Sequence, residues 1–122
     1  MNVAVIGASK QRDKFGNKAV RSYLKHGHRV FPVNLRETEI EGQRAYRSIR
    51  DIPVELDATL VYVPPEVTLR LLSEITRKGP GMLYLNPGSE DDAVVARAAE
   101  LGLEPILACS ILAIGDRPSN YR

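Results

Sequence analysis

The sequence predicts an α/β fold, a doubly wound parallel sheet of about five strands flanked by helices. Short apolar segments rich in β-branched residues alternate along the chain with longer segments whose apolar residues recur at helical spacing. The first of these, residues 3–6, is continuously apolar and rich in β-branched residues, which is typical of a strand that is buried on both faces in a parallel sheet. An arrangement of this kind is a Rossmann-like sheet.

The expected elements follow from this alternation and from the glycines and prolines that interrupt it. The first helix begins near residues 13–16 and ends at Gly27, the second covers the chain from Glu66 to Gly79, and the third covers 93–101. Ser89 and Asp92 form a plausible capping pair for that third helix. Pro32 indicates either an edge position for the second strand or the start of that strand. The expected strands cover residues 3–6, 29–33, 58–63, 82–85 and 103–107, with a minor strand at 42–46 and a helical turn at 48–52.

Length and composition restrict the class of protein. At 122 residues, 43% hydrophobic and 26% charged, the chain fits one soluble globular domain over residues 1–122, with 115–122 as a C-terminal tail. No apolar run approaches the length of a membrane span and nothing resembles a signal peptide, so we expect a cytoplasmic protein. The single cysteine, Cys109, excludes an internal disulfide and argues against structural zinc.

The net charge of +2 is unevenly distributed. Residues 1–50 hold eleven lysines and arginines against four acids, and residues 51–122 hold six against eleven. Lys10, Lys14 and their basic neighbours therefore create a field that favours an anionic ligand. The alternative is an ordinary solvated helix face. Nucleic-acid binding is not expected, because no aromatic residues are interleaved with the basic ones.

The most informative segment is the first strand and the Gly7-Ala8-Ser9 that ends it. A glycine at this point lets the backbone turn sharply and lets a ligand come close. Ser9 adds a hydroxyl, and the amides of the helix start that follows favour an anion. The next glycine, Gly16, comes nine residues later, so the phosphate loop is longer than the dinucleotide fingerprint. The alternative interpretation is that Gly7 only makes a tight turn.

The end of the second strand discriminates between nucleotides. An NAD site usually places Asp or Glu here to bind the ribose hydroxyls. This chain has Asn34, Leu35 and Arg36 instead. Because a guanidinium is present and a carboxylate is not, the ligand is expected to carry an extra phosphate at its adenosine end, which leaves coenzyme A (CoA) and NADP as candidates.

These segments together resemble the CoA-binding domain proteins, whose sheet is similar to the CoA-binding domain of the succinyl-CoA synthetase α subunit. The resemblance covers nearly the whole chain and rests on the order and spacing of its markers. The markers are Val5 to Ser9, Gly27, Val30, Pro32 to Asn34, Gly42, Tyr46, Asp51 to Pro53, Asp57, Val63 to Glu66, Asn86 to Gly88, Gly102, Leu103 and Cys109.

The resemblance implies a CoA-binding site at the carboxyl ends of the strands. By position, the resemblance implies that the pyrophosphate contacts Gly7, Ala8, Ser9 and Lys10. It implies that Asn34 and Arg36 lie on the ribose phosphate side. Val63, Pro64 and Pro65 would line the path of adenine or pantetheine. Lys14, Asn86 and Gly88 complete the candidate site.

The resemblance supplies no catalytic group. The synthetase's catalytic histidine lies in a domain without a counterpart in these residues, and His26 and His28 are typical of a surface turn. No Ser-His-Asp set, metal-ligand cluster or Walker loop occurs. Cys109 is interpreted as a buried inert thiol, with a mixed disulfide with CoA as the alternative.

Three functions therefore remain open. The preferred one is a non-catalytic module that binds CoA or an acyl-CoA. The second is an NADP-binding oxidoreductase or redox regulator, and the third is an interaction protein with a vestigial pocket, present as a homo-oligomer or with a partner protein.

Overall fold

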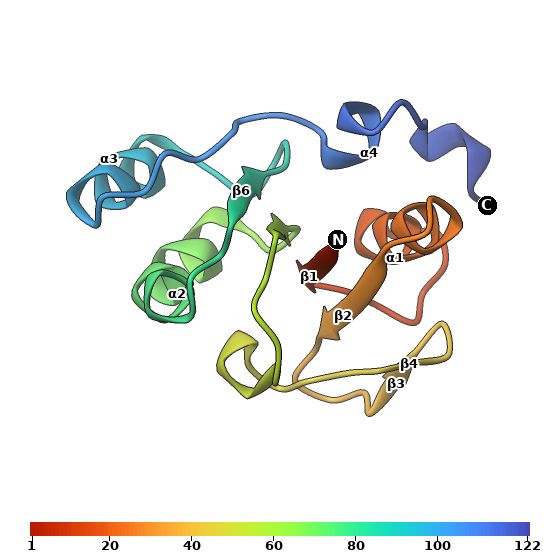
Figure 1. The fold of residues 1–122 in the computed structure, drawn as a ribbon. Helices are drawn as coiled ribbons and strands as arrows, with labels where there is room; N and C mark the ends of the chain where they lie inside the picture. The colour runs from red at the N-terminus through yellow and green to blue at the C-terminus, as the bar shows by residue number, and fades with distance from the viewer.

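A computed structural model describes residues 1–122 as three layers, with a parallel sheet between two layers of helices (Figure 1). The sheet has four strands in the order β2-β1-β5-β6, so the chain passes from β1 to β2 on one side and then returns across β1 to β5 on the other. The doubly wound parallel fold predicted from the sequence is confirmed. The strands are β1 (Asn2–Ile6), β2 (Arg29–Val33), β5 (Ala58–Val61) and β6 (Met82–Leu85).

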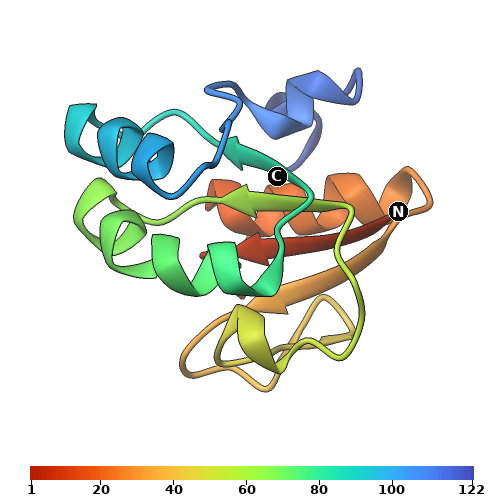
Figure 2. The same cartoon turned by 60° about the vertical axis from the view of Figure 1, so that its left-hand side comes forward.

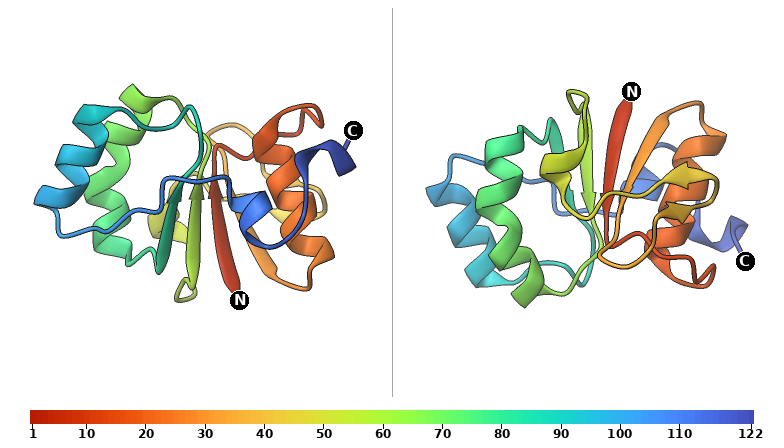
Figure 3. Two further views of the ribbon diagram at one scale, coloured as in Figure 1. Left: turned by 90° about the horizontal axis from the view of Figure 1, so that it is seen from above. Right: turned by 90° about the horizontal axis from the view of Figure 1, so that it is seen from below.

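Helices cover both faces of this sheet (Figure 3). On one side lie α1 (Phe15–Lys25) and the short α4 (Ser110–Ala113), and on the other lie α2 (Pro65–Lys78) and α3 (Asp92–Glu100). Successive strand residues point to opposite faces, so one strand contributes to two cores. In β1, Val3 and Val5 pack in the core beneath α1, whereas Ala4 and Ile6 pack in the core beneath α2 and α3.

The fifth strand predicted at residues 103–107 is wrong. This segment forms a single bridge with β6, in which Ile106 donates to the carbonyl of Leu83 at 2.7 Å and accepts from the amide of Leu85 at 2.9 Å. Pro105 has no amide to donate, and Ile106 and Leu107 are exposed rather than covered by a helix. Local apolar character therefore indicates a strand that the tertiary structure does not form.

Smaller elements differ in detail from the sequence prediction. The minor strand expected at 42–46 is a two-stranded hairpin of β3 (Glu39–Ile40) and β4 (Gln43–Arg44), while the turn expected at 48–52 is the helical turn η1 (Ile49–Asp51). The capping pair predicted for α3 is wrong: Asp91 accepts from the amide of Val94 at 2.9 Å. Ser89 donates instead to the carbonyl of Asn86. The predicted edge position of β2 is confirmed.

The C-terminal residues pack against α1 rather than extending into solvent. Asp116, 6% exposed, accepts hydrogen bonds from Ser22 of α1 at 2.7 Å, from Asn120 at 2.8 Å, and from the hydroxyl of Tyr121. The last turn of this segment is η2 (Pro118–Asn120). No helix in the chain is long and apolar enough to cross a bilayer.

Hydrogen bonds from Tyr121, Ser22 and Asn120 hold the pKa of Asp116 well below the ordinary 3.8. Because the folded pKa is below the unfolded one, the stabilisation is present above pH 3.8 and is lost as the pH falls toward the folded pKa. We expect Asp116→Asn to lower Tm near neutral pH and to reduce the loss of Tm on acidification. Melting curves between about pH 6 and about pH 3 measure both effects. Asp13→Asn, at an exposed carboxylate, is the control, and an equal acid response in all three proteins would contradict the assignment.

Candidate functional site

The loops that follow the parallel strands gather at one end of the sheet, toward which the strand arrows point in Figure 2. A cavity of about 680 Å³ lies there, beside the switch point between β1 and β5. Nine of the predicted site residues line it: Gly7, Ala8, Ser9, Lys14, Asn34, Val63, Pro64, Asn86 and Gly88. The structure thus brings together residues that are up to 81 positions apart.

Three predicted residues lie outside this cavity. Lys10 is exposed and forms an ion pair with Glu37 at 3.1 Å. Pro65 is the first residue of α2, and its ring lines neither of the two main cavities. Arg36 lines the second cavity, of about 400 Å³, which lies next to the first and shares Gly7, Asn34 and Val63 with it.

Two glycines shape the loop between β1 and α1. Gly7 has φ +90°, and a Cβ there would lie 2.9 Å from the carbonyl of Tyr62. A Cβ at Gly16 would lie only 2.1 Å from the carbonyl oxygen of Gly7. No residue other than glycine therefore lets the first turn of α1 approach the end of β1 this closely. The sequence reasoning noted Gly16 only by its spacing and missed this contact.

The amides of the same loop are available to a ligand. The N–H groups of Ala8, Ser9, Phe15 and Gly16 donate to no acceptor within the protein. Phe15 and Gly16 are the first two residues of α1, where the helix dipole adds positive potential. Free amides at a glycine-rich turn and a helix start are the arrangement that proteins use to bind phosphate.

Charged side chains near the loop are largely paired with one another. Lys10 pairs with Glu37, and Arg12 pairs with Glu41 at 3.4 Å. Lys14, the residue before α1, lines the cavity and has no acidic partner. The strongly basic first half of the sequence therefore leaves one free ammonium group at the cavity wall.

Asn34 braces the loop from the end of β2. Its side-chain amide donates to the carbonyl of Ala8 at 2.9 Å, and its oxygen accepts from the amides of Arg36 and Glu37 at 2.7 and 2.8 Å. Asn34 thus connects the loop after β1 with the loop after β2. Its hydrogen bonds are to the protein backbone, although it also lines the cavity.

A buried polar network supports the opposite wall. Asn86, 1% exposed, donates to the carbonyl of Val61 at 3.0 Å and accepts from both the amide and the hydroxyl of Ser110. The same hydroxyl lies 2.8 Å from that of Tyr62, whose pKa is raised by burial. Cys109 precedes Ser110 and lines the cavity. Tyr62 and Phe15 are lining residues that the sequence analysis did not identify.

The second cavity combines cations with apolar walls. Arg36 and Arg47 line it together with Val67 and Leu71 of α2. Arg36 forms no ion pair, and its backbone amide is fixed by Asn34. The two guanidinium groups and the apolar walls suit a ligand with a flat apolar ring and a phosphate.

The histidines lie at the other end of α1. The Nδ1 atom of His26 is 2.7 Å from the carbonyl of Ser22 and 3.8 Å from Asp116. His28 lies 3.2 Å from the N-terminal amine, and burial is the main cause of its lowered pKa. Neither histidine lines either cavity.

Comparison with known proteins assigns the family. A family profile described as the CoA binding domain matches residues 1–115. The chain belongs to this family. The resemblance to CoA-binding domain proteins drawn from the sequence is thereby confirmed, and coenzyme A is the ligand that the family and its CoA ligase relatives support.

The relatives include isolated domains and longer enzymes. The chain is 36% identical over 88 residues to the α subunit of ADP-forming acetate–CoA ligase II from Pyrococcus furiosus, covering 70% of this chain and 19% of that subunit. A conserved hypothetical protein from Pyrococcus furiosus has the same fold at a TM-score of 0.84 and 33% identity, over 92% of this chain and 97% of its own.

The fold also occurs within a larger synthetase. The dinucleotide-forming acetyl-coenzyme A synthetase 1 of Candidatus Korarchaeum cryptofilum, in complex with phosphate and ADP, matches with a TM-score of 0.77 and 26% identity. The match covers 88% of this chain and 25% of the synthetase. The chain spans between 11% and 19% of the length of the curated ligases that it matches.

Proposed function

We propose that this protein binds coenzyme A, free or acylated, at the carboxyl ends of its strands, and that it carries out no catalysis by itself. The supporting observation is the set of unpartnered amides at Ala8, Ser9, Phe15 and Gly16, which faces the same cavity as the free ammonium of Lys14. Together they provide donors and positive charge for a pyrophosphate.

The two adjoining cavities divide the ligand between them. The pyrophosphate lies on the loop from Gly7 to Lys10, where the cavities meet. The 3′-phosphoadenosine end occupies the smaller cavity, where Arg36 and Arg47 bind its extra phosphate and Val63 contributes to the wall that contacts adenine. The pantetheine arm extends through the larger cavity along Pro64, Asn86 and Gly88.

The proposal assigns no general acid or base to the site because of where the two histidines and Tyr62 lie, and it gives Cys109, which lines the larger cavity, no catalytic role. The two histidines are at the far end of α1 from the phosphate loop, and Tyr62 is half-buried, with a raised pKa and a hydroxyl contact to Ser110. General acid or base catalysis needs a group that titrates near the working pH and reaches the substrate. A partner protein or a second copy of the chain would be needed to supply one.

An NADP-binding oxidoreductase or redox regulator is the second candidate, favoured by the two arginines of the smaller cavity. A 2′-phosphate on adenosine would meet them as well as a 3′-phosphate would. NAD is disfavoured, because Glu37, the carboxylate nearest the end of β2, pairs with Lys10 and lines neither cavity.

Calorimetry with CoA, dephospho-CoA, NADP, NAD and ATP tests the proposal directly. We expect CoA to bind most tightly, because it combines a pantetheine arm for the larger cavity with an extra phosphate for the arginines of the smaller one. CoA that binds no better than ATP would contradict the proposal, and NADP that outcompetes CoA would favour the second candidate. No nucleotide affinity, together with a stable oligomer or partner complex by native mass spectrometry, would indicate an interaction protein.

We expect Arg36→Ala to weaken the binding free energy of CoA by about 1 to 3 kcal/mol, because a charge-assisted hydrogen bond to the extra phosphate is lost. Dephospho-CoA lacks that phosphate and should bind nearly as before. Titration calorimetry with both ligands measures the difference. Arg29→Ala, at the opposite end of β2, is the matched control. Equal losses for the two ligands would show that Arg36 does not contact the extra phosphate.

Lys14 and Lys10 give a second matched pair, because they are neighbouring loop lysines with different partners. Lys14→Ala removes the unpaired cation of the cavity wall, and we expect CoA affinity to fall by about tenfold. Lys10→Ala removes a cation that is already paired with Glu37, and the loss should be several-fold smaller. Affinities measured at two salt concentrations check that the loss is larger for Lys14→Ala than for Lys10→Ala. A larger loss for Lys10→Ala would contradict the prediction.

A further inference from the structure

The hairpin of β3 and β4 has an unusual residue at its tip. The two strands are joined by Glu41 and Gly42, whose φ angles are +49° and +76°. Two-residue turns with both φ angles positive strongly favour Gly, which has no Cβ, or Asn and Asp, whose short polar side chains hydrogen-bond locally, at the first position. Glu41 is the one residue in the chain other than glycine with a positive φ. A glutamate is therefore present where the backbone disfavours it.

The carboxylate at this tip reaches across to the phosphate loop. One oxygen of Glu41 accepts from the side-chain amide of Asn17 at 3.1 Å, and the other lies 3.4 Å from the guanidinium of Arg12. Aspartate or asparagine would suit the turn better but has a shorter side chain. The extra methylene of glutamate is what gives the hairpin this reach.

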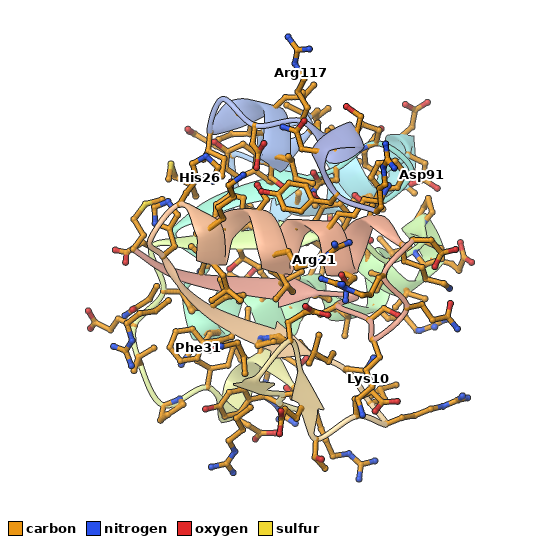
Figure 4. All side chains as sticks on the ribbon, turned by 90° about the vertical axis from the view of Figure 1, so that its right-hand side faces the viewer. Lys10, Arg21, His26, Phe31, Asp91 and Arg117 are labelled. Atoms are coloured by element: carbon orange, nitrogen blue, oxygen red, sulfur yellow. The ribbon has the colours of Figure 1, made fainter.

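Asn17 connects Glu41 to the backbone of the loop. It is fully buried in the first turns of α1, and its amide also donates to the carbonyl of Ser9 at 2.8 Å. Its oxygen accepts from Arg21 at 2.7 Å, and Arg21 donates in turn to the carbonyl of Arg12. Figure 4 shows Arg21 on α1 and Lys10 in the loop that precedes this helix.

These hydrogen bonds fix the direction of a peptide group in the loop. The C=O and N–H of a trans peptide point in opposite directions, so holding the carbonyl of Ser9 also sets the direction of the amide of Lys10. Asn34 acts in the same way on the carbonyl of Ala8 and the amide of Ser9. The loop carbonyls are thus held by side chains of the protein, and the orientation of the loop amides is set before a ligand binds.

We propose that Glu41 is a positioning residue for the phosphate loop, which it holds through Asn17 in the conformation that binds an anion. The proposal rests on the proposed binding of CoA at this loop. A carboxylate near a phosphate would weaken binding by its charge alone. Positioning and charge repulsion therefore predict opposite results when Glu41 is shortened.

Glu41→Asn is the decisive variant, because asparagine suits the turn but cannot reach Asn17. We expect the Kd for CoA to rise about tenfold, the usual order for a lost hydrogen bond to a charged group, with Tm within about 4 °C of the unchanged protein. Glu41→Gln keeps the acceptor for Asn17 and should keep the Kd within about threefold. Glu39→Gln, on the same hairpin, is the control for loss of charge alone.

An unchanged or lower Kd in Glu41→Asn would overturn the proposal, and so would an equal loss in Glu41→Gln. If the unchanged protein does not bind CoA, the proposed function fails. NMR without ligand then tests whether Glu41, through Asn17, holds the loop in place. Amide resonances of Ser9 and Lys10 that move in Glu41→Asn, and not in Glu39→Gln, support the positioning role. Resonances that stay unchanged in both variants overturn it.

Discussion

The close approach of α1 to the end of β1 is the constraint on which the site depends. The gap between Gly16 and the carbonyl of Gly7 leaves no room for a side chain. This contact turns the loop between them so that the first amides of α1 and the amides after β1 serve one cavity. The parallel sheet supplies the other walls, because it brings the loops after β2, β5 and β6 to the same end.

Hydrogen bonds between distant segments keep these walls in place. Asn34 connects the loops after β1 and β2, while Asn86 connects the end of β6 to β5 and to Ser110. Each of these asparagines uses both its amide and its oxygen within the protein. Polar side chains at strand ends thus serve mainly to shape the cavity here, and the contacts left for a ligand come chiefly from the backbone. A ligand held by backbone amides is recognised by its phosphates rather than by its bases.

The sequence predicted those features that depend on local pattern. Short apolar runs identified the four strands, and glycines and prolines marked where they end, which also identified most of the cavity lining. The sequence prediction was wrong where strand pairing in the tertiary structure decides whether a strand forms. Ile106 lies in an apolar run but forms only one bridge. The sequence prediction could not find Tyr62 and Phe15 as lining residues, because their pattern is that of an ordinary strand end and an ordinary helix start. The role of Gly16 depends on its distance from Gly7 in space, which spacing along the chain does not reveal.

Charge shows most clearly why pairing matters more than composition. The first 50 residues carry a large excess of basic residues, yet Lys10 and Arg12 in the loop between β1 and α1 are each paired with a glutamate. Those glutamates come from the segment between β2 and η1, which folds back against the loop. The positive potential that remains at this loop therefore comes from the unpaired ammonium of Lys14 and from the start of α1. Backbone amides are directional donors and discriminate between anions by shape, whereas a lysine ammonium acts as a point charge and a diffuse basic surface attracts any polyanion. The two glutamates thus offset part of the basic excess beside the loop, which composition alone does not reveal.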